Sequence, residues 1–150
     1  MKTIVFAGGG TEGHVIPNIA LIDELESEFR CCYIGAGEVE RRLIQDTYPD
    51  GGVKCFHIKA RKFRRKLTHG NLLLPFYFVK SVYRAEKIIK HVKPSLVFSK
   101  GGFVSLPFVV AGWLKRIPVL AHEGDLSPGL ANKLSKPSCR KVILIFGTAL

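Results

Sequence analysis

The sequence predicts an α/β domain built on a Rossmann-like, doubly wound parallel sheet. Three observations lead to this fold class. Short apolar segments alternate with longer helical patterns along the 150 residues, the apolar segments are hydrophobic almost throughout, and glycine-rich or polar loops follow several of them. Such sheets bind ligands at the carboxyl ends of their strands, near the topological switch point. The loops after the predicted strands are therefore the candidate functional segments.

The chain begins with a predicted strand, helix and strand. Thr3–Ala7 is a β-branched and aromatic run followed by glycines, which is typical of a buried strand. Val15–Phe29 carries a broad apolar face at helical spacing, and Pro17 suits the first turn of such a helix. Cys31–Ile34 is a second short apolar strand, which Gly35 closes.

The middle of the chain predicts two further helices around a third strand. Glu38–Thr47 has the pattern of a short amphipathic helix, and Val53–Ile58 that of a strand. Asn71–Val92 has the length and apolar periodicity of a long helix, in which Pro75 is tolerated because it lies near the start.

The last third of the chain continues the alternation. Predicted strands lie at Ser95–Phe98, Pro118–Ala121 and Lys141–Phe146. The helix predicted at Val104–Lys115 is mostly apolar and should be buried on most sides, and a short helix is predicted at Gly129–Leu134. The length suits one domain with one sizeable core.

Composition excludes several protein classes. With 47% apolar and 23% charged residues, the chain is not disordered. The longest nearly apolar stretches, 72–79 and 103–114, are too short to span a bilayer, and the first predicted strand leaves no room for a signal peptide. The cysteines form neither a C-x-x-C pair nor a zinc pattern, which indicates reduced, mostly buried thiols; they are Cys31, Cys32, Cys55 and Cys139.

The formal net charge of +11 is unevenly distributed. Residues 1–50 hold 4 basic and 9 acidic side chains, whereas residues 51–150 hold 19 basic and 3 acidic ones. The densest basic run, KARKFRRK at 59–66, has six positive charges in eight residues. A membrane surface, a nucleic acid or an acidic ligand would each suit this excess.

The first loop, GGGTEGH at 8–14, satisfies G-x-G-x-x-G between a strand and a helix. Glycine N–H groups and a helix N-terminus favour an anion at such a place. A dinucleotide site also needs an acidic residue at the end of the second strand, where Glu38 comes late. A tight turn that only packs the helix on the strand is the alternative.

The second loop, SKGGFVS at 99–105, follows the fourth predicted strand and also opens a helix. Two such glycine loops at strand ends suggest a diphosphate or a sugar held between two backbone nests.

The third loop, HEGDLSPG at 122–129, puts three titratable side chains where an apolar strand has just ended. A histidine or carboxylate there could act as a general base. Alternatively, Asp125 or Ser127 caps the helix that follows. Asn132 and Lys133 lie one helical turn further on, and either could face the cleft or solvent.

Three segments together resemble a known family: GGGTEGHVIPNIAL (8–21), FSKGGFVSLPFVVA (98–111) and IPVLAHEGDLSPGLANKL (117–134). In content, order and spacing they resemble the N-terminal half of the MurG family, in its firmicute-like branch, and the resemblance covers essentially the whole chain. The members are UDP-N-acetylglucosamine:undecaprenyl-diphospho-muramoyl-pentapeptide N-acetylglucosaminyltransferases of peptidoglycan synthesis.

The resemblance implies a GT-B fold, in which two Rossmann-like domains face a cleft. It implies that an N-terminal domain, residues 1–150, takes the lipid-linked acceptor, and that a C-terminal domain holds most of the UDP-N-acetylglucosamine donor. A base deprotonates the muramoyl C4 hydroxyl, which attacks the anomeric carbon with inversion and expels UDP. No metal and no organic cofactor is needed.

Family members are much longer than this chain, so the resemblance also implies that the donor-binding domain is absent from it. These 150 residues alone are then expected not to transfer sugar at a useful rate. Two alternatives stay open: the membrane-side subunit of a split glycosyltransferase, and a non-catalytic anion- or nucleotide-binding module.

The loops and the resemblance together nominate the site residues. The candidate catalytic residues, between which the sequence does not choose, are His14 and Glu123. The candidate substrate-binding residues are Thr11, Glu12, Gly13, Gly101, Gly102, His122, Asp125 and Asn132.

Two of these positions depart from the common family pattern. Glu12 stands where many members have Gly, and because a carboxylate is unfavourable beside a diphosphate, we expect it to contribute only its backbone. Asp125 stands where many members have Asn, and it can accept a hydrogen bond from a sugar hydroxyl but cannot donate one as an amide does.

The basic run and the apolar residues after it suit an anionic membrane surface, because cationic side chains are attracted to it and apolar ones insert at its interface. We therefore expect a peripheral protein on the cytoplasmic face of the cell membrane. The predicted membrane-docking patch comprises Lys59, Arg61, Lys62, Arg64, Arg65, Lys66, Leu73, Leu74, Phe76 and Tyr77. A solvated charged loop is the alternative, and no nucleic-acid partner is expected because no binding motif for one is present.

Overall fold

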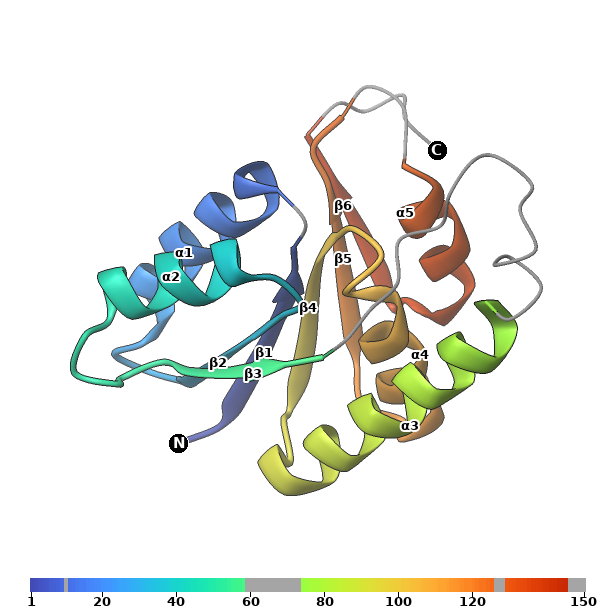
Figure 1. Cartoon of the computed structure of the whole chain (residues 1–150), viewed down its shortest axis with the longest axis horizontal. Helices are drawn as coiled ribbons and strands as arrows, with labels where there is room; N and C mark the ends of the chain where they lie inside the picture. Colours follow the sequence, from blue (N-terminus) through green and yellow to red (C-terminus); the bar gives the residue numbers. More distant parts are fainter. Residues whose placement is uncertain (10, 59–73, 126–128, 146–150) are drawn as a thin grey trace.

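The computed structural model describes residues 1–9, 11–58, 74–125 and 129–145. Within them the strands form one parallel sheet in the order β3-β2-β1-β4-β5-β6 (Figure 1). The strands are β1 (Thr3–Gly8), β2 (Arg30–Gly35), β3 (Lys54–His57), β4 (Leu96–Gly101), β5 (Val119–Glu123) and β6 (Lys141–Leu144). The predicted fold class is confirmed. The switch point lies between β1 and β4, because the strand order runs outward from these two in opposite directions.

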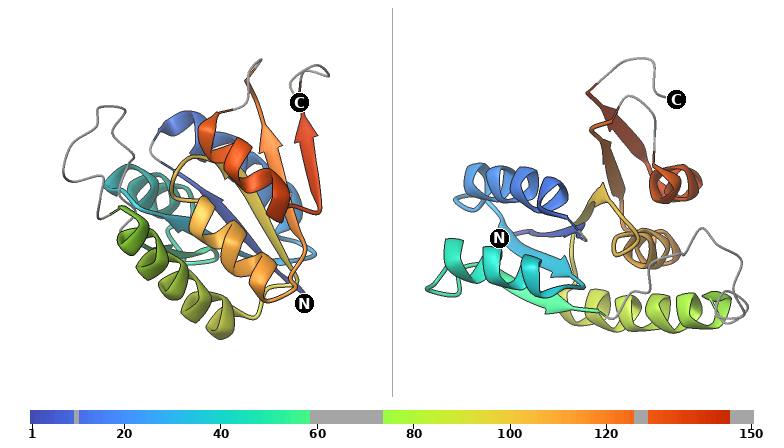
Figure 2. Two further views of the ribbon diagram at one scale, coloured as in Figure 1. Left: turned by 90° about the vertical axis from the view of Figure 1, so that its right-hand side faces the viewer. Right: turned by 45° about the horizontal axis from the view of Figure 1, so that its top comes forward.

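Helices cover both faces of the sheet (Figures 1 and 2). On one face lie α1 (Glu12–Leu25) and α2 (Glu38–Thr47). On the other lie α3 (Leu74–Val92), α4 (Leu106–Leu114) and α5 (Leu130–Ser135), and a 3₁₀ turn at Lys136–Ser138 follows α5.

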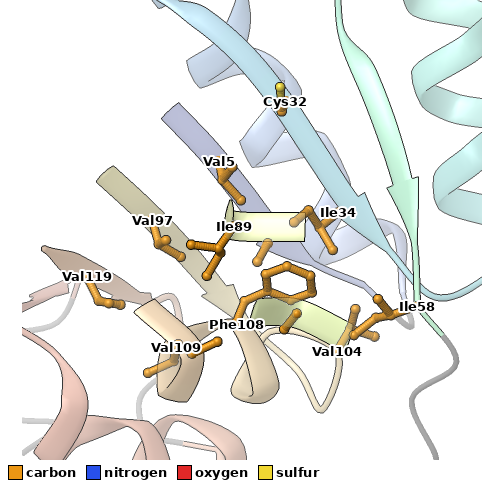
Figure 3. Close-up of a cluster of buried hydrophobic side chains, with 13 residues drawn as sticks. Val5, Cys32, Ile34, Ile58, Ile89, Val97, Val104, Phe108, Val109 and Val119 are labelled. Carbon is orange, nitrogen blue, oxygen red and sulfur yellow. The ribbon is translucent and has the colours of Figure 1, made fainter. Parts of the chain in front are cut away.

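The core is divided into two layers by the sheet, as β1 illustrates. Ile4 and Phe6 join the cluster under α1 and α2, whereas Val5 and Ala7 join the cluster under α3 and α4. Phe108 of α4 is fully buried in the second cluster (Figure 3). Because both faces of the central strands are covered, these strands are hydrophobic almost throughout.

Helix α1 differs from its prediction at both ends. It begins at Glu12 instead of Val15, so Pro17 lies at its sixth residue and not in its first turn. Since proline has no N–H, the Gly13 carbonyl lacks its usual helical donor. The helix ends at Leu25, where a short turn leads into β2.

Strands β4 and β5 are longer than predicted. Ser99, Lys100 and Gly101 were expected in the second loop, and His122 and Glu123 in the third, but all five belong to the strands. Ladder hydrogen bonds continue past the apolar residues, so their polar side chains stand on the rigid sheet. The other predicted boundaries agree within two residues, and residues 71–73 lie outside the described part.

Candidate functional site

The predicted loops meet at the carboxyl ends of β1, β4 and β5, in the middle of the sheet (Figure 1). Gly8, at the end of β1, pairs with Gly101 at the end of β4, and the register shifts between Ala7 and Gly8. The Tyr33 hydroxyl on β2 donates a hydrogen bond to the Gly8 carbonyl at 2.8 Å. The sheet and the Tyr33 hydroxyl therefore hold the backbone of Gly8 in place where the first loop begins.

The first and second loops touch at glycines. Gly101 and Gly102 have φ of +99° and +82°, a region that side chains rarely adopt. A Cβ on Gly102 would lie 2.7 Å from the Gly9 carbonyl oxygen and 3.7 Å from Nε2 of His14. Glycine is thus required here both by the backbone conformation and by the closeness of the two loops.

His14, in the first turn of α1, has an imidazole suited to accept a proton. Its Nδ1 is buried and has no hydrogen-bond partner among the described residues. Burial first, and then the charge of Lys100, lower the pKa of His14, while Asp125, Glu123 and a hydrogen bond with the Lys100 backbone raise it. The net lowered pKa keeps the ring neutral near pH 7, the form that can act as a general base.

Lys100 was given no role by the sequence analysis, yet it stands in the centre of the site. It is only 7% exposed, and a Cβ on Gly124 would lie 2.9 Å from its Nζ. No acidic group of the described residues lies within ion-pair distance of it. Burial lowers the pKa of Lys100, against the opposite effect of Glu123 and Asp125.

Glu123, the last residue of β5, has both carboxylate oxygens occupied. Oε1 accepts the Asp125 N–H at 3.1 Å, and Oε2 accepts the Gly129 N–H at 3.1 Å and an Nδ2 hydrogen of Asn132 at 2.8 Å. Burial alone would raise the pKa of Glu123, but these hydrogen bonds outweigh it and the pKa is lowered. This carboxylate is a weak base that links the third loop to α5.

The remaining predicted residues of the third loop and α5 surround this carboxylate. Asn132 is buried, its Nδ2 also donates to the His122 carbonyl at 3.3 Å, and its Oδ1 has no partner among the described residues. His122 is half-buried, and burial followed by the charge of Lys100 lowers its pKa. Asp125 is exposed at the rim.

The other first-loop residues are exposed at the start of α1: Thr11, Glu12 and Gly13. Glu12 lies in the first turn of the helix, where the partial positive charge of the N-terminus favours a carboxylate. The side chain is therefore stable in solvent, and a contribution of the Glu12 backbone to binding stays a prediction.

Glu40 is a site residue that the sequence reasoning missed. It is 1% exposed, and three glycines pack on it: a Cβ on Gly9 would overlap its carboxyl group, and one on Gly35 or Gly37 would lie 2.8 or 2.5 Å from its side chain. Gly37 is the N-cap of α2 and Glu40 is three residues later, the spacing at which a glutamate reaches back to a helix start. That spacing could have indicated the start of α2 from the sequence, but it could not have indicated the contact of Glu40 with the first loop.

A pocket of about 380 Å³ opens beside His14 and is called here the His14–Glu40 pocket. Its apolar lining comes from Ala36, Val39, Phe103 and Val104. Its polar side chains are those of Thr11, His14 and Glu40, and no lysine or arginine lines it among the described residues.

Most of the predicted membrane-docking patch lies outside the described residues, because residues 59–73 and the side chain of Leu74 are not described. Of the rest, Phe76 is 66% exposed and Tyr77 is half-buried. Val79 and Tyr83 extend the exposed apolar surface along α3.

The described residues hold no group of three or more His, Cys, Asp or Glu side chains that could bind a metal ion. In the same part of the chain, every helix is too short or too polar to cross a membrane.

Comparison with known proteins relates most of the chain to glycosyltransferases. A family model described as the glycosyltransferase family 28 N-terminal domain matches residues 4–144. A curated UDP-N-acetylglucosamine--N-acetylmuramyl-(pentapeptide) pyrophosphoryl-undecaprenol N-acetylglucosamine transferase of Clostridium botulinum (strain Langeland) is 49% identical over 148 residues, 97% of this chain and 41% of that protein. The protein of the same name from Clostridium tetani is 46% identical over 147 residues, 97% of this chain and 40% of its own length.

Solved structures show the same fold. The crystal structure of Acinetobacter baumannii MurG superposes with a TM-score of 0.82 at 24% identity, over 100% of this chain and 43% of that one. The Staphylococcus aureus MnaA–UDP structure superposes with a TM-score of 0.71 at 16% identity, over 99% of this chain and 39% of that one. At these identities the likeness concerns the fold alone. The chain spans 40–41% of the length of the two curated relatives.

Proposed function

This chain belongs to the family of glycosyltransferase family 28 N-terminal domains, and we propose that it is the acceptor-binding part of a peptidoglycan N-acetylglucosaminyltransferase. The reaction proposed is the inverting transfer of N-acetylglucosamine from UDP-N-acetylglucosamine to the C4 hydroxyl of undecaprenyl-diphospho-muramoyl-pentapeptide. The 49% identity to a curated transferase of that name carries this proposal. The match covers 41% of that relative, and we propose that the donor is held mainly by the part of the enzyme that corresponds to the relative's remaining length.

Within this function, His14 is the proposed general base. Its neutral ring and unpartnered Nδ1, at the edge of a pocket, support the role. Glu123 is the weaker candidate because its carboxylate already accepts three hydrogen bonds from Asp125, Gly129 and Asn132. We assign Glu123 the task of positioning the third loop.

A chimera tests the base. The chain is joined to the remaining part of the Clostridium botulinum relative, and transfer from UDP-N-acetylglucosamine to a short-prenyl diphospho-muramoyl-pentapeptide is measured. His14→Asn should lower kcat by about 10²–10⁴-fold, the usual contribution of general acid–base catalysis. Activity within a few-fold of the parent would remove His14 from this role. The unfused chain should show no useful turnover.

Calorimetry on the chain separates this proposal from a nucleotide-binding module. The same acceptor analogue should bind, and UDP-N-acetylglucosamine should bind weakly or not at all. Tight binding of UDP-N-acetylglucosamine together with no binding of the acceptor analogue would contradict the proposal.

We also propose that α3 docks at the cytoplasmic face of an anionic membrane. Phe76, Val79 and Tyr83 are exposed at spacings that place them on one side of the helix, and Lys80 and Arg84 are exposed beside them. Exposed apolar side chains flanked by basic ones suit an anionic lipid interface.

Vesicle sedimentation tests this docking. The chain should bind phosphatidylglycerol-containing vesicles more strongly than pure phosphatidylcholine vesicles, and Val79→Ser should weaken binding. Ile16→Ser on α1 is the matched control, because Ile16 is also an exposed apolar helix residue. Equal binding to both vesicle types would contradict the electrostatic part, and equal effects of the two variants would contradict the place of docking.

A further inference from the structure

The His14–Glu40 pocket has no assigned occupant, although it shares the proposed base with the reacting centre. Its volume of about 380 Å³ is in the range of pockets that hold part of a small-molecule ligand. It lies on the side of His14 that faces α2, whereas Glu123 and Asn132 bind one another on the side of β5 and α5.

The side chains of its lining disfavour a phosphate. The described lining contains one acidic side chain, Glu40, and no lysine or arginine. Burying an anion beside a carboxyl group without a cation is costly. Lys100, the buried cation of the site, lies against Gly124 at the end of β5 and does not line this pocket.

The same lining suits an uncharged group with small apolar parts and amide groups. Ala36, Val39, Phe103 and Val104 offer apolar contacts, and the exposed hydroxyl of Thr11 can accept a hydrogen bond from an N–H donor or donate one to a carbonyl. A lactyl ether joined by an amide to a peptide has both features.

The geometry of a hexose then limits which part of the acceptor can enter. If His14 takes the proton of the C4 hydroxyl, the groups on the two neighbouring ring carbons are the C3 substituent and the hydroxymethyl group on C5, and the diphosphate on C1 lies across the ring. Of these two neighbours, only the C3 substituent can carry both apolar and amide groups. In a muramoyl sugar the C3 substituent is the lactyl-peptide arm. A pocket that has His14 in its wall is therefore within reach of this arm and not of the diphosphate.

We propose that the His14–Glu40 pocket is the subsite for the lactyl-peptide arm of the acceptor, and this inference rests on the proposed function. The subsite selects an acceptor whose lactyl carboxyl is joined to a peptide as an amide. It also turns the C4 hydroxyl toward His14.

Amide ¹H–¹⁵N NMR titrations of the chain with three soluble sugars test this assignment. N-acetylmuramyl-dipeptide should bind at least about tenfold more tightly than N-acetylglucosamine, because apolar groups are added to a fitted pocket. It should shift the resonances of Ala36, Val39 and Phe103. N-acetylmuramic acid, whose lactyl group is a free carboxylate, should bind more weakly than the dipeptide.

A pocket-filling variant sharpens the test. Val39→Phe should abolish the preference for the dipeptide, and Leu114→Phe on α4 should preserve it, because both residues are exposed on helices but only Val39 lines the pocket. The inference is overturned if the dipeptide binds no better than N-acetylglucosamine, if Val39→Phe leaves its preference intact, or if inorganic pyrophosphate shifts the pocket resonances instead.

The outcomes also separate this inference from the proposed function. Shifts near His14, Gly101 and Asn132 without shifts at the pocket overturn only the pocket assignment. Failure of all three sugars to shift any of these resonances contradicts the acceptor function, and the subsite with it.

Discussion

Replacing Glu123 by glutamine should destabilise the chain measurably, although the two side chains have nearly the same shape. The carboxylate accepts the Asp125 N–H on Oε1, and the Gly129 N–H and Asn132 Nδ2 on Oε2. An amide has only one accepting oxygen. In either orientation its NH₂ group therefore points at one or two of these donors, which lose their hydrogen-bond acceptor. An unsatisfied buried donor costs about 1–3 kcal/mol, and the charge assistance is lost as well.

We therefore expect the Glu123→Gln variant to lose about 2–3 kcal/mol of unfolding free energy at pH 7. For a chain of this size, this corresponds to a fall in Tm of roughly 4–12 °C. Thermal and urea unfolding followed by circular dichroism measure both quantities.

The loss should depend on pH in a defined direction. The folded-state pKa of Glu123 lies below its ordinary value of 4.5, so its stabilising contribution is complete above 4.5. This stabilising contribution is lost as the pH falls through the lowered folded-state pKa of Glu123. The stability gap between parent and variant should therefore close in acid.

Two results would refute this reasoning: equal Tm values at pH 7, or a gap that does not change as the pH falls. Glu38→Gln is the matched control. Glu38 is exposed and pairs with Arg41 on the surface of α2, so its replacement should change Tm little.

Two further predictions concern Lys100 and the second glycine loop. Lys100→Met removes a positive charge and should raise the pKa of both His14 and His122, whereas Lys100→Arg should not; imidazole NMR titration measures this, and unchanged midpoints in the Met variant would contradict it. Gly102→Ala should cost about 1–3 kcal/mol in urea unfolding, because φ is +82° and the new Cβ would lie 2.7 Å from a carbonyl oxygen. Gly52→Ala, in open space, should cost little, and equal losses would remove the steric explanation.

The sheet was predictable because its signals are local. Ile4–Ala7 and Cys31–Ile34 are apolar throughout, and an apolar run of that length has few stable alternatives to a strand covered on both faces. The ends of elements were less predictable. Pro17 suggested a helix start, yet α1 begins five residues before it, because packing against the sheet outweighs one missing hydrogen bond.

The position of the candidate site in the fold was predictable in outline for a related reason. Glycines and polar residues placed directly after apolar strands must lie at one edge of a parallel sheet, which located His14, Gly102 and Glu123. Glu40 was not identified because its partners in space, Gly9 and Gly35, come from other segments of the chain. No local pattern records such a contact.

The sequence by itself determined the class of sheet, the edge that carries the site and the family of the chain, because each depends on residue type and order. Only the tertiary structure decided the chemical states within the site. It separated His14, with a neutral ring and an unpartnered nitrogen, from Glu123, with both oxygens occupied, and it put the charge of Lys100 beside both imidazoles. The pKa of a side chain depends on its burial and on the charges close to it in space, and the order of residues along the chain does not reveal either one.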